Sequence, residues 1–206
     1  MKKFFLSKIV LAAAAAAFMS SAAFAEFNLR TSVDIAGDYE QGDNYRTFDV
    51  ETSATLSGDY LRGIGGLGKY LKIGGGFEIL APKFYKHNST GWDDPFWFLP
   101  LYISIQTNPV PPVPELFFRL NLGYNLFFID TNFDASGWAE TYKGGLYYSF
   151  VTGWEFPFGL FFDITYAFYN GTITQERAFY STRESDYLYS RLGVGIGYKF
   201  GRVRNY

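Results

Sequence analysis

Large apolar residues alternate with small or polar residues along most of this chain. In the closing stretch RLGVGIGYKF every second position from Leu192 to Phe200 is large and apolar, and the positions between them are Gly193, Gly195, Gly197 and Lys199. Successive side chains of a β-strand point to opposite faces. The stretch therefore predicts a strand with one bulky face and one nearly empty face.

The same alternation recurs in eight segments, each of which predicts a strand. They span Glu26–Gly37, Arg46–Gly58, Lys69–Ala81, Phe96–Gln106, Glu115–Ile129, Thr141–Glu155, Leu160–Asn170 and Tyr187–Phe200. The stretches between them are rich in Gly, Asp, Asn, Ser and Pro, and no helical periodicity follows residue 25. The sequence thus predicts an all-β fold, an eight-stranded antiparallel β-barrel, in a domain of residues 26–206.

The terminal glycines have a second interpretation, a phosphate-binding loop. Their spacing is GxGxG rather than GxGxxG, and no helix is predicted after them. The interpretation as a strand is therefore favoured.

Side-chain volume decides which face of the barrel should be bulky. Aromatic residues make up 21% of the chain, yet the mean hydropathy is only −0.04. An eight-stranded barrel has an interior just wide enough to be filled by side chains, and the bulky faces of all eight strands would overfill it. A soluble barrel of the lipocalin kind places bulk inside, whereas a membrane barrel places it outside. We therefore expect a transmembrane β-barrel whose lumen is lined by the glycines and polar residues.

The faces expected to line the lumen also carry charges of both signs. The expected network consists of Arg30, Asp34, Asp49, Glu51, Lys72, Glu78, Arg119, Lys143, Asp163 and Arg191, with Glu155 and Lys199 in addition. Buried charges must be paired or hydrated, so two arrangements are open: ion pairs that fill the lumen, or a charged lining around a pore. The balance of signs favours a filled lumen, because a selective channel tends to carry an excess of one sign.

The N-terminus has the three regions of a secretory signal peptide. Residues MKKFF are basic, IVLAAAAAAFM is apolar, and AFA at residues 23–25 is a small-x-small site that predicts cleavage after Ala25. A membrane anchor is the alternative, but the apolar core is short and rich in alanine. Export without any cysteine means a fold without disulfides. The net charge of −2 argues against a nucleic-acid partner.

In these features the chain resembles the small outer-membrane β-barrels, the group that includes the OmpA transmembrane domain and the OmpX- and OmpW-type proteins. The resemblance rests on the AFA cleavage site, the eight alternating strands and the terminal strand RLGVGIGYKF. It implies a bacterial outer-membrane location with both termini in the periplasm. It also implies that the assembly machinery recognises a terminal aromatic residue, here Phe200 or Tyr206, and that lipid surrounds the wall.

Candidate chemistry is sparse. His87 and Ser89 have the His-x-Ser spacing of outer-membrane lipid A deacylases, but they fall in a polar loop without an acidic partner that can be placed beside them. No metal or cofactor site is expected. We predict a non-catalytic outer-membrane protein with a structural or binding role, whose exposed loops contact a surface ligand. A narrow channel or carrier for small apolar molecules is the first alternative, and a lipid A deacylase is the second.

Overall fold

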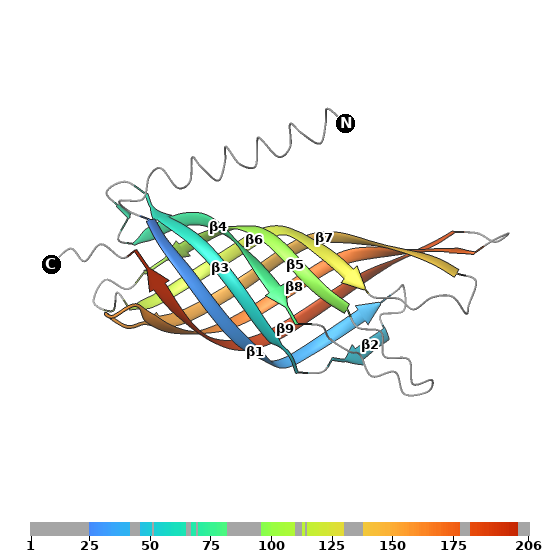
Figure 1. Ribbon diagram of the computed structural model, residues 1–206, viewed down its shortest axis with the longest axis horizontal. Helices are drawn as coiled ribbons and strands as arrows, with labels where there is room; N and C mark the ends of the chain where they lie inside the picture. The colour runs from blue at the N-terminus through green and yellow to red at the C-terminus, as the bar shows by residue number, and fades with distance from the viewer. Residues whose placement is uncertain are drawn as a thin grey trace, which may run out of the picture.

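The computed structural model is a closed, all-antiparallel barrel of eight long strands (Figure 1). It describes residues 25–41, 46–50, 52–64, 67–68, 70–81, 96–109, 113, 115–129, 138–177 and 182–201. The eight strands are β1 (Ala25–Gln41), β3 (Ala54–Gly63), β4 (Leu71–Leu80), β5 (Phe96–Thr107), β6 (Leu116–Ile129), β7 (Trp138–Glu155), β8 (Leu160–Arg177) and β9 (Arg183–Phe200). None of the described residues forms a helix long and apolar enough to cross a bilayer.

Neighbours in sequence are neighbours in the sheet, and the first and last strands close it. The order runs from β1 through β3 to β9, with β9 paired to β1 from Phe27↔Phe200 to Gln41↔Tyr187. A short ninth strand, β2 (Arg46–Asp49), pairs with the end of β1. Ala25 and Phe200 lie at one end of the barrel, called here the terminus end; the opposite end is the loop end (Figure 1).

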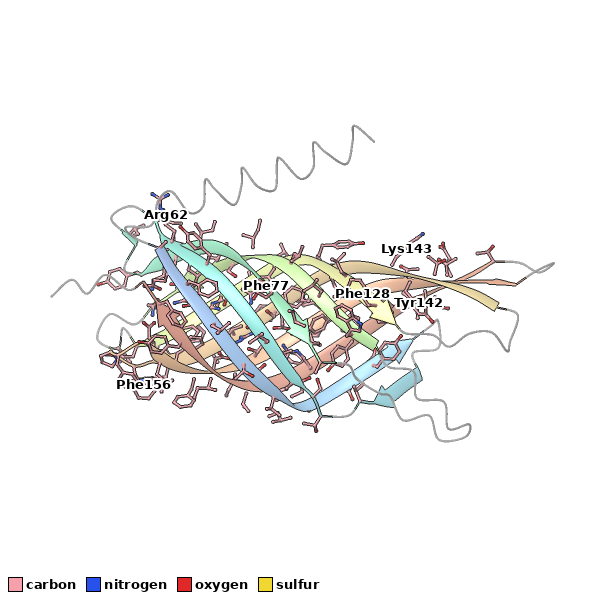
Figure 2. The ribbon with its side chains drawn as sticks, in the orientation of Figure 1. Arg62, Phe77, Phe128, Tyr142, Lys143 and Phe156 are labelled. Atoms are coloured by element: carbon pink, nitrogen blue, oxygen red, sulfur yellow. The ribbon has the colours of Figure 1, made fainter. Side chains whose placement is uncertain are left out.

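The prediction of bulky faces pointing outward is confirmed. On β9 Val194, Ile196, Tyr198 and Phe200 are exposed, whereas the glycines between them are buried. A belt of exposed aliphatic and aromatic side chains surrounds the wall on every long strand, and Ile103 on β5 is 63% exposed. Aromatic pairs stand at both rims of this belt, with Phe27 beside Phe200 and Trp97 stacked on Phe128 at 4.1 Å between ring centroids. Phe77, Phe128 and Phe156 can be followed in Figure 2.

Several strands are longer than the alternation predicted. β8 continues to Arg177 and β9 begins at Arg183, so most of the expected loop 171–186 is a hairpin paired as far as Gln175↔Arg183. β3 likewise continues to Gly63, past the predicted end at Gly58. The prediction failed here because polar and glycine residues, which were interpreted as loop, are also compatible with strands that face a polar lumen.

Two irregularities change which way side chains point. The pairing of β1 with β9 shifts between Asp34 and Ala36, and the pairing of β7 with β8 shifts between Gly144 and Tyr147. Each shift is a β-bulge, an extra residue on one strand that reverses the alternation beyond it. The bulge in β7 turns Tyr142 toward the lumen, where it packs against the buried core.

Candidate functional site: the lumen

The centre of the lumen holds a group of buried charges bridged by one carboxylate. Glu78 on β4 accepts a hydrogen bond from Arg30 Nη2 at 3.0 Å through one oxygen and from Arg191 Nη2 at 2.6 Å through the other. Arg191 also donates to Asp34 Oδ1 at 2.5 Å. Both arginines and Glu78 are almost completely buried. We call Arg30, Asp34, Glu78, Asp163 and Arg191 the central ion cluster.

Uncharged side chains add hydrogen bonds to the two arginines of the central ion cluster. Arg30 donates through Nε to Ser57 Oγ at 2.8 Å and through Nη1 to Thr165 Oγ1 at 2.9 Å. Arg191 Nε donates to the hydroxyl of Tyr169 at 2.8 Å. Because buried charges are tolerated only when their donors and acceptors are satisfied, these contacts hold the guanidinium groups in place.

A second ion pair joins β3 to β6. Arg119 pairs with Asp59, and it donates through Nη2 to Gln106 Oε1 at 2.9 Å. The other oxygen of Asp59 accepts from the hydroxyl of Tyr102 at 2.7 Å. The pair therefore ties together three strands of the wall, β3, β5 and β6.

A third group lies at the terminus end. Lys199 pairs with Glu155 and lies 3.9 Å from Glu26 Oε2, while Lys72 Nζ is 2.6 Å from the same oxygen. The ammonium of Lys199 also stands 5.3 Å from the ring centroid of Phe117. This terminus-end ion cluster is less deeply buried than the central one, since the side chains of Lys72 and Glu26 are 12% and 14% exposed.

The loop-side half of the lumen is aromatic instead of charged. Phe98 lies at its centre and stacks on Tyr169 at 5.0 Å, on Tyr189 at 5.6 Å and on Phe127 at 4.9 Å between ring centroids. The buried members of this aromatic cluster are Tyr39, Leu80, Phe98, Tyr102, Phe127, Tyr147, Ala167, Tyr169, Ile173, Tyr187 and Tyr189. The tyrosines connect the two halves, because the ring of Tyr169 stacks on Phe98 while its hydroxyl bonds Glu78 and Arg191.

The terminal glycines are required by what stands opposite them. A Cβ atom at Gly197 would lie 2.2 Å from the ring of Phe161 and 2.7 Å from the carbonyl oxygen of Leu29. At Gly195 it would lie 2.9 Å from a carboxylate oxygen of Asp163. The absence of side chains on this face of β9 makes room for the large residues of β8.

The structure brings together most, but not all, of the charges that the sequence placed in the lumen. Arg30, Asp34, Glu78, Asp163 and Arg191 meet at the centre, Arg119 pairs with Asp59, and Lys72 lies at the terminus end. Lys143 is instead exposed on the outer face of β7, because the bulge at Gly144–Tyr147 reverses the alternation there; Figure 2 shows it and Tyr142 on opposite sides of the strand. The side chain of Asp49 and the whole of Glu51 lie outside the described residues.

The sequence analysis missed Asp59 and Glu26. Asp59 continues the period of Thr55 and Ser57 along β3 and was lost only because Gly58 was interpreted as the end of the strand. Glu26 is in phase with Asn28 and Arg30 on the lumen face of β1, but it is the first residue of the predicted strand, and the lumen face was taken to begin at Asn28.

The other residues singled out in the sequence cannot be placed. His87, Ser89, Tyr206 and the signal-peptide residues 1–24 lie outside the described residues. Phe200 is the last residue of β9 and is exposed. Within the part of the chain that the structure describes, no group of three or more histidine or acidic side chains could hold a metal ion.

Comparisons with solved structures agree with this architecture. The outer membrane protein OprG from Pseudomonas aeruginosa superposes with a TM-score of 0.53 and 13% identity, over 86% of this chain and 96% of that one. Ail, the attachment invasion locus protein of Yersinia pestis, solved in complex with the heparin analogue sucrose octasulfate, gives 0.49 and 13% over 86% and 99%. Neisserial surface protein A gives 0.47 and 11% over 84% and 97%. No protein-family model and no curated protein matches the sequence.

The likeness to OprG shows a shared fold. A closed antiparallel wall, apolar on the outside and charged within, leaves no strand edge unpaired in lipid, and this is the condition for a β-structure to cross a bilayer. The chain has the fold of the small eight-stranded outer-membrane β-barrels, of the kind typified by OmpA, OmpX and OmpW.

Proposed function

We propose that the protein is a non-catalytic component of the bacterial outer membrane, with both termini in the periplasm and the loop end outside the cell. Its role is structural, or it binds a ligand at the cell surface. The observation that carries the proposal is the filled lumen. The central ion cluster spans it from β1 and β4 to β8 and β9, and the aromatic cluster lies directly above.

The loop end also offers a surface suited to binding. β7, β8 and β9 remain paired toward the loop end beyond the last pairing of β6 with β7 at Tyr124↔Leu146, and they project past the barrel as a three-stranded sheet (Figure 1). Among the described residues, nothing pairs with the β6-facing edge of β7 over Trp138–Lys143. An open edge of this kind can accept an extended segment of another protein.

Two further partners belong to the same proposal. Outer-membrane lipid covers the exposed apolar belt, and the assembly machinery recognises the terminal aromatic residue, Phe200 or Tyr206. Deleting residues 201–206 separates these two candidates, because assembly survives the deletion only if Phe200 is recognised.

Single-channel conductance in a planar lipid bilayer tests the filled lumen. Protein whose folded state is verified by heat-modifiable gel migration should insert without producing current steps. A variant in which Arg30, Glu78 and Arg191 are all replaced by Ala serves as the matched sample with a widened lumen, and it should conduct. Reproducible steps from the unaltered protein would overturn the proposal.

A narrow channel or carrier for small apolar molecules is the second candidate, and the aromatic lining of the loop-side half favours it. Uptake of a small aromatic molecule into lipid vesicles tests this directly. Equal uptake rates with and without the folded protein would contradict transport.

Hydrolysis of lipid A would contradict the non-catalytic proposal, and it can be measured directly. Mass spectrometry of lipid A from cells with the protein, without it, and with His87→Ala should give identical spectra. Loss of an acyl chain that depends on both the protein and His87 would make it an enzyme.

A further inference from the structure

Among the described residues, the loop-side ends of β5 and β6 have backbone pairing with each other but not with the rest of the wall. β5 pairs with β6 as far as Phe96↔Ile129. The pairing of β4 with β5 stops at Phe77↔Leu101, and the pairing of β6 with β7 stops at Tyr124↔Leu146. Among the described residues, two seams without backbone pairing therefore flank the segment Phe96–Pro100 with Asn125–Ile129, called here the β5–β6 flap.

Local chemistry fixes where each seam begins. Pro100 has no backbone N–H to donate to a neighbouring strand. The ladder between β4 and β5 ends at Leu101, the next residue toward the terminus end. On the other side the ladder between β6 and β7 ends where the β7 bulge begins, although Gly144 still lies close to the backbone carbonyl of Asn125. The carbonyls that the bulge releases are not left bare, because Tyr124 donates its hydroxyl to Gly144 at 2.8 Å and Asn170 Nδ2 donates to Leu146 at 3.1 Å.

The seams begin near the loop-side border of the apolar belt. The nine residues Leu116–Tyr124 of β6 are paired on both sides. At about 3.3 Å per residue and a tilt of about 40°, they rise roughly 20 Å, close to the height of about 25 Å expected for the lipid-facing band. The flap therefore lies at the loop-side border of the belt, where Trp97 and Phe128 stand at its rim.

Among the described residues, contacts between side chains hold the flap against the barrel. Phe98 contacts Tyr169, Tyr187 and Tyr189 of β8 and β9 across the lumen. Phe127 contacts Tyr187 at 4.7 Å and Tyr142 at 5.3 Å between ring centroids. The buried side chain of Asn125 also faces the hydroxyl of Tyr187 on β9.

We infer that the β5–β6 flap swings away from the barrel about Leu101 and Tyr124, with Phe98 and Phe127 as its latch. Opening exposes the aromatic cluster to the outside while the central ion cluster stays closed below it. The motion is a conformational device that the filled lumen of the proposed function does not itself require, so each can fail without the other.

Single cysteines report the motion cleanly, because the chain has none of its own. Asn125→Cys places a thiol at a fully buried lumen position of the flap, and Ser104→Cys places one at a fully buried lumen position of β5 below the seam. Each protein is folded in lipid nanodiscs and treated with a charged maleimide, and unfolded samples give the total thiol. We expect the cysteine at 125 to react at least tenfold faster than the cysteine at 104. Equal rates would overturn the inference.

A second pair of variants tests whether Phe98 holds the flap closed. Phe98→Ala removes the central ring of the aromatic cluster, whereas Phe117→Ala removes an equally buried ring at the terminus end, beside Phe161. Phe98→Ala should raise the reaction rate of the cysteine at 125 at least tenfold, and Phe117→Ala should leave it unchanged. An equal effect of both substitutions would show general loosening and would contradict a latch. If Phe98→Ala does not fold, the comparison of positions 125 and 104 in the otherwise unaltered chain still decides the matter.

Discussion

At the scale of single residues, the lumen depends on side chains that serve two partners at once. Glu78 is the clearest case, since each of its oxygens holds a different arginine from a different strand. Buried ion pairs add little net stability compared with apolar packing, but removing one member leaves an uncompensated charge. Such residues therefore act chiefly as constraints that fix which strands can face each other across the barrel.

Glu78→Gln should be strongly destabilising for this reason. It leaves two buried guanidinium groups short of one negative charge, and breaking a buried pair costs about 3–5 kcal/mol. Urea titration of the protein in lipid vesicles, followed by heat-modifiable gel migration, measures the loss. Asp38→Asn is the control, because Asp38 is exposed on β1. Equal stability of the two variants would show that the central ion cluster carries no such constraint.

Replacing different glycines of β9 by alanine should destabilise the protein to different extents. Gly197→Ala would place a methyl group against the Phe161 ring and a backbone oxygen, whereas at Gly193 the nearest atom, Arg191 Nη1, is 3.0 Å away and the next nearest are 3.4 Å away. Overpacking typically costs about 1–3 kcal/mol, so Gly197→Ala should lose about that much and Gly193→Ala less. The same unfolding measurement ranks them, and the reverse order would refute this account of the glycines.

Residue-level prediction from the sequence succeeded where the alternation was unbroken. The inward positions Arg30, Glu78 and Arg191 follow from counting by two along a strand. Which of these charges form ion pairs could not be predicted from the sequence, because the pairing depends on how far each strand is staggered against its neighbours. Asp59 was lost to an interpretation of Gly58 as a terminator, although glycine is compatible with a strand.

At the scale of elements, the two bulges change which side chains face the lumen, and a regular strand cannot do this. The bulge in β1 leaves Ile35 and Ala36 both exposed and brings Tyr39 into the lumen, and the bulge in β7 does the same for Tyr142. The number and order of strands could be predicted, since they depend on long stretches of alternation. The bulges could not, because one extra residue changes the phase of the pattern without leaving a distinctive residue type.

Tyr124→Phe tests whether the β7 bulge is held by a side chain. It deletes the hydroxyl that bonds the Gly144 carbonyl, and a hydrogen bond of this type contributes about 0.5–1.5 kcal/mol. The free energy of unfolding should fall by about that amount. Tyr166→Phe is the matched control, because Tyr166 is also an exposed tyrosine, on β8. A loss no greater than in the control would mean that water or lipid headgroups satisfy the carbonyl as well.

At the scale of the whole molecule, the outward belt and the charged lumen invert the arrangement of a soluble domain. The exposed face that alternates along all eight strands is favourable only if lipid covers it. The polar lumen face that alternates with this apolar face explains why an aromatic-rich chain has a mean hydropathy near zero.

Ile103→Arg tests whether lipid covers the exposed face, because Ile103 lies at mid-height on the wall. Arginine facing lipid at the bilayer midplane costs about 2–4 kcal/mol, whereas the same change near the interface costs about 0–1 kcal/mol. Leu67→Arg, in the turn between β3 and β4 at the terminus end and 60% exposed, is the interfacial control for Ile103, which is 63% exposed. Ile103→Arg should therefore destabilise the protein in vesicles far more than Leu67→Arg. Equal small effects would favour a soluble barrel.

The pairing of β1 with β9 also determines when the barrel can close during synthesis and export. Its fourteen recorded partner pairs join residues from opposite ends of the polypeptide, such as Phe27 and Phe200. Contacts so distant in sequence form slowly, because the intervening chain must first be gathered. Until β9 has been synthesised and exported, β1 and β8 both remain open edges, so the nascent chain must be kept from pairing with its neighbours in transit. A ribosome that stops early thus releases no smaller barrel, only a substrate for proteolysis.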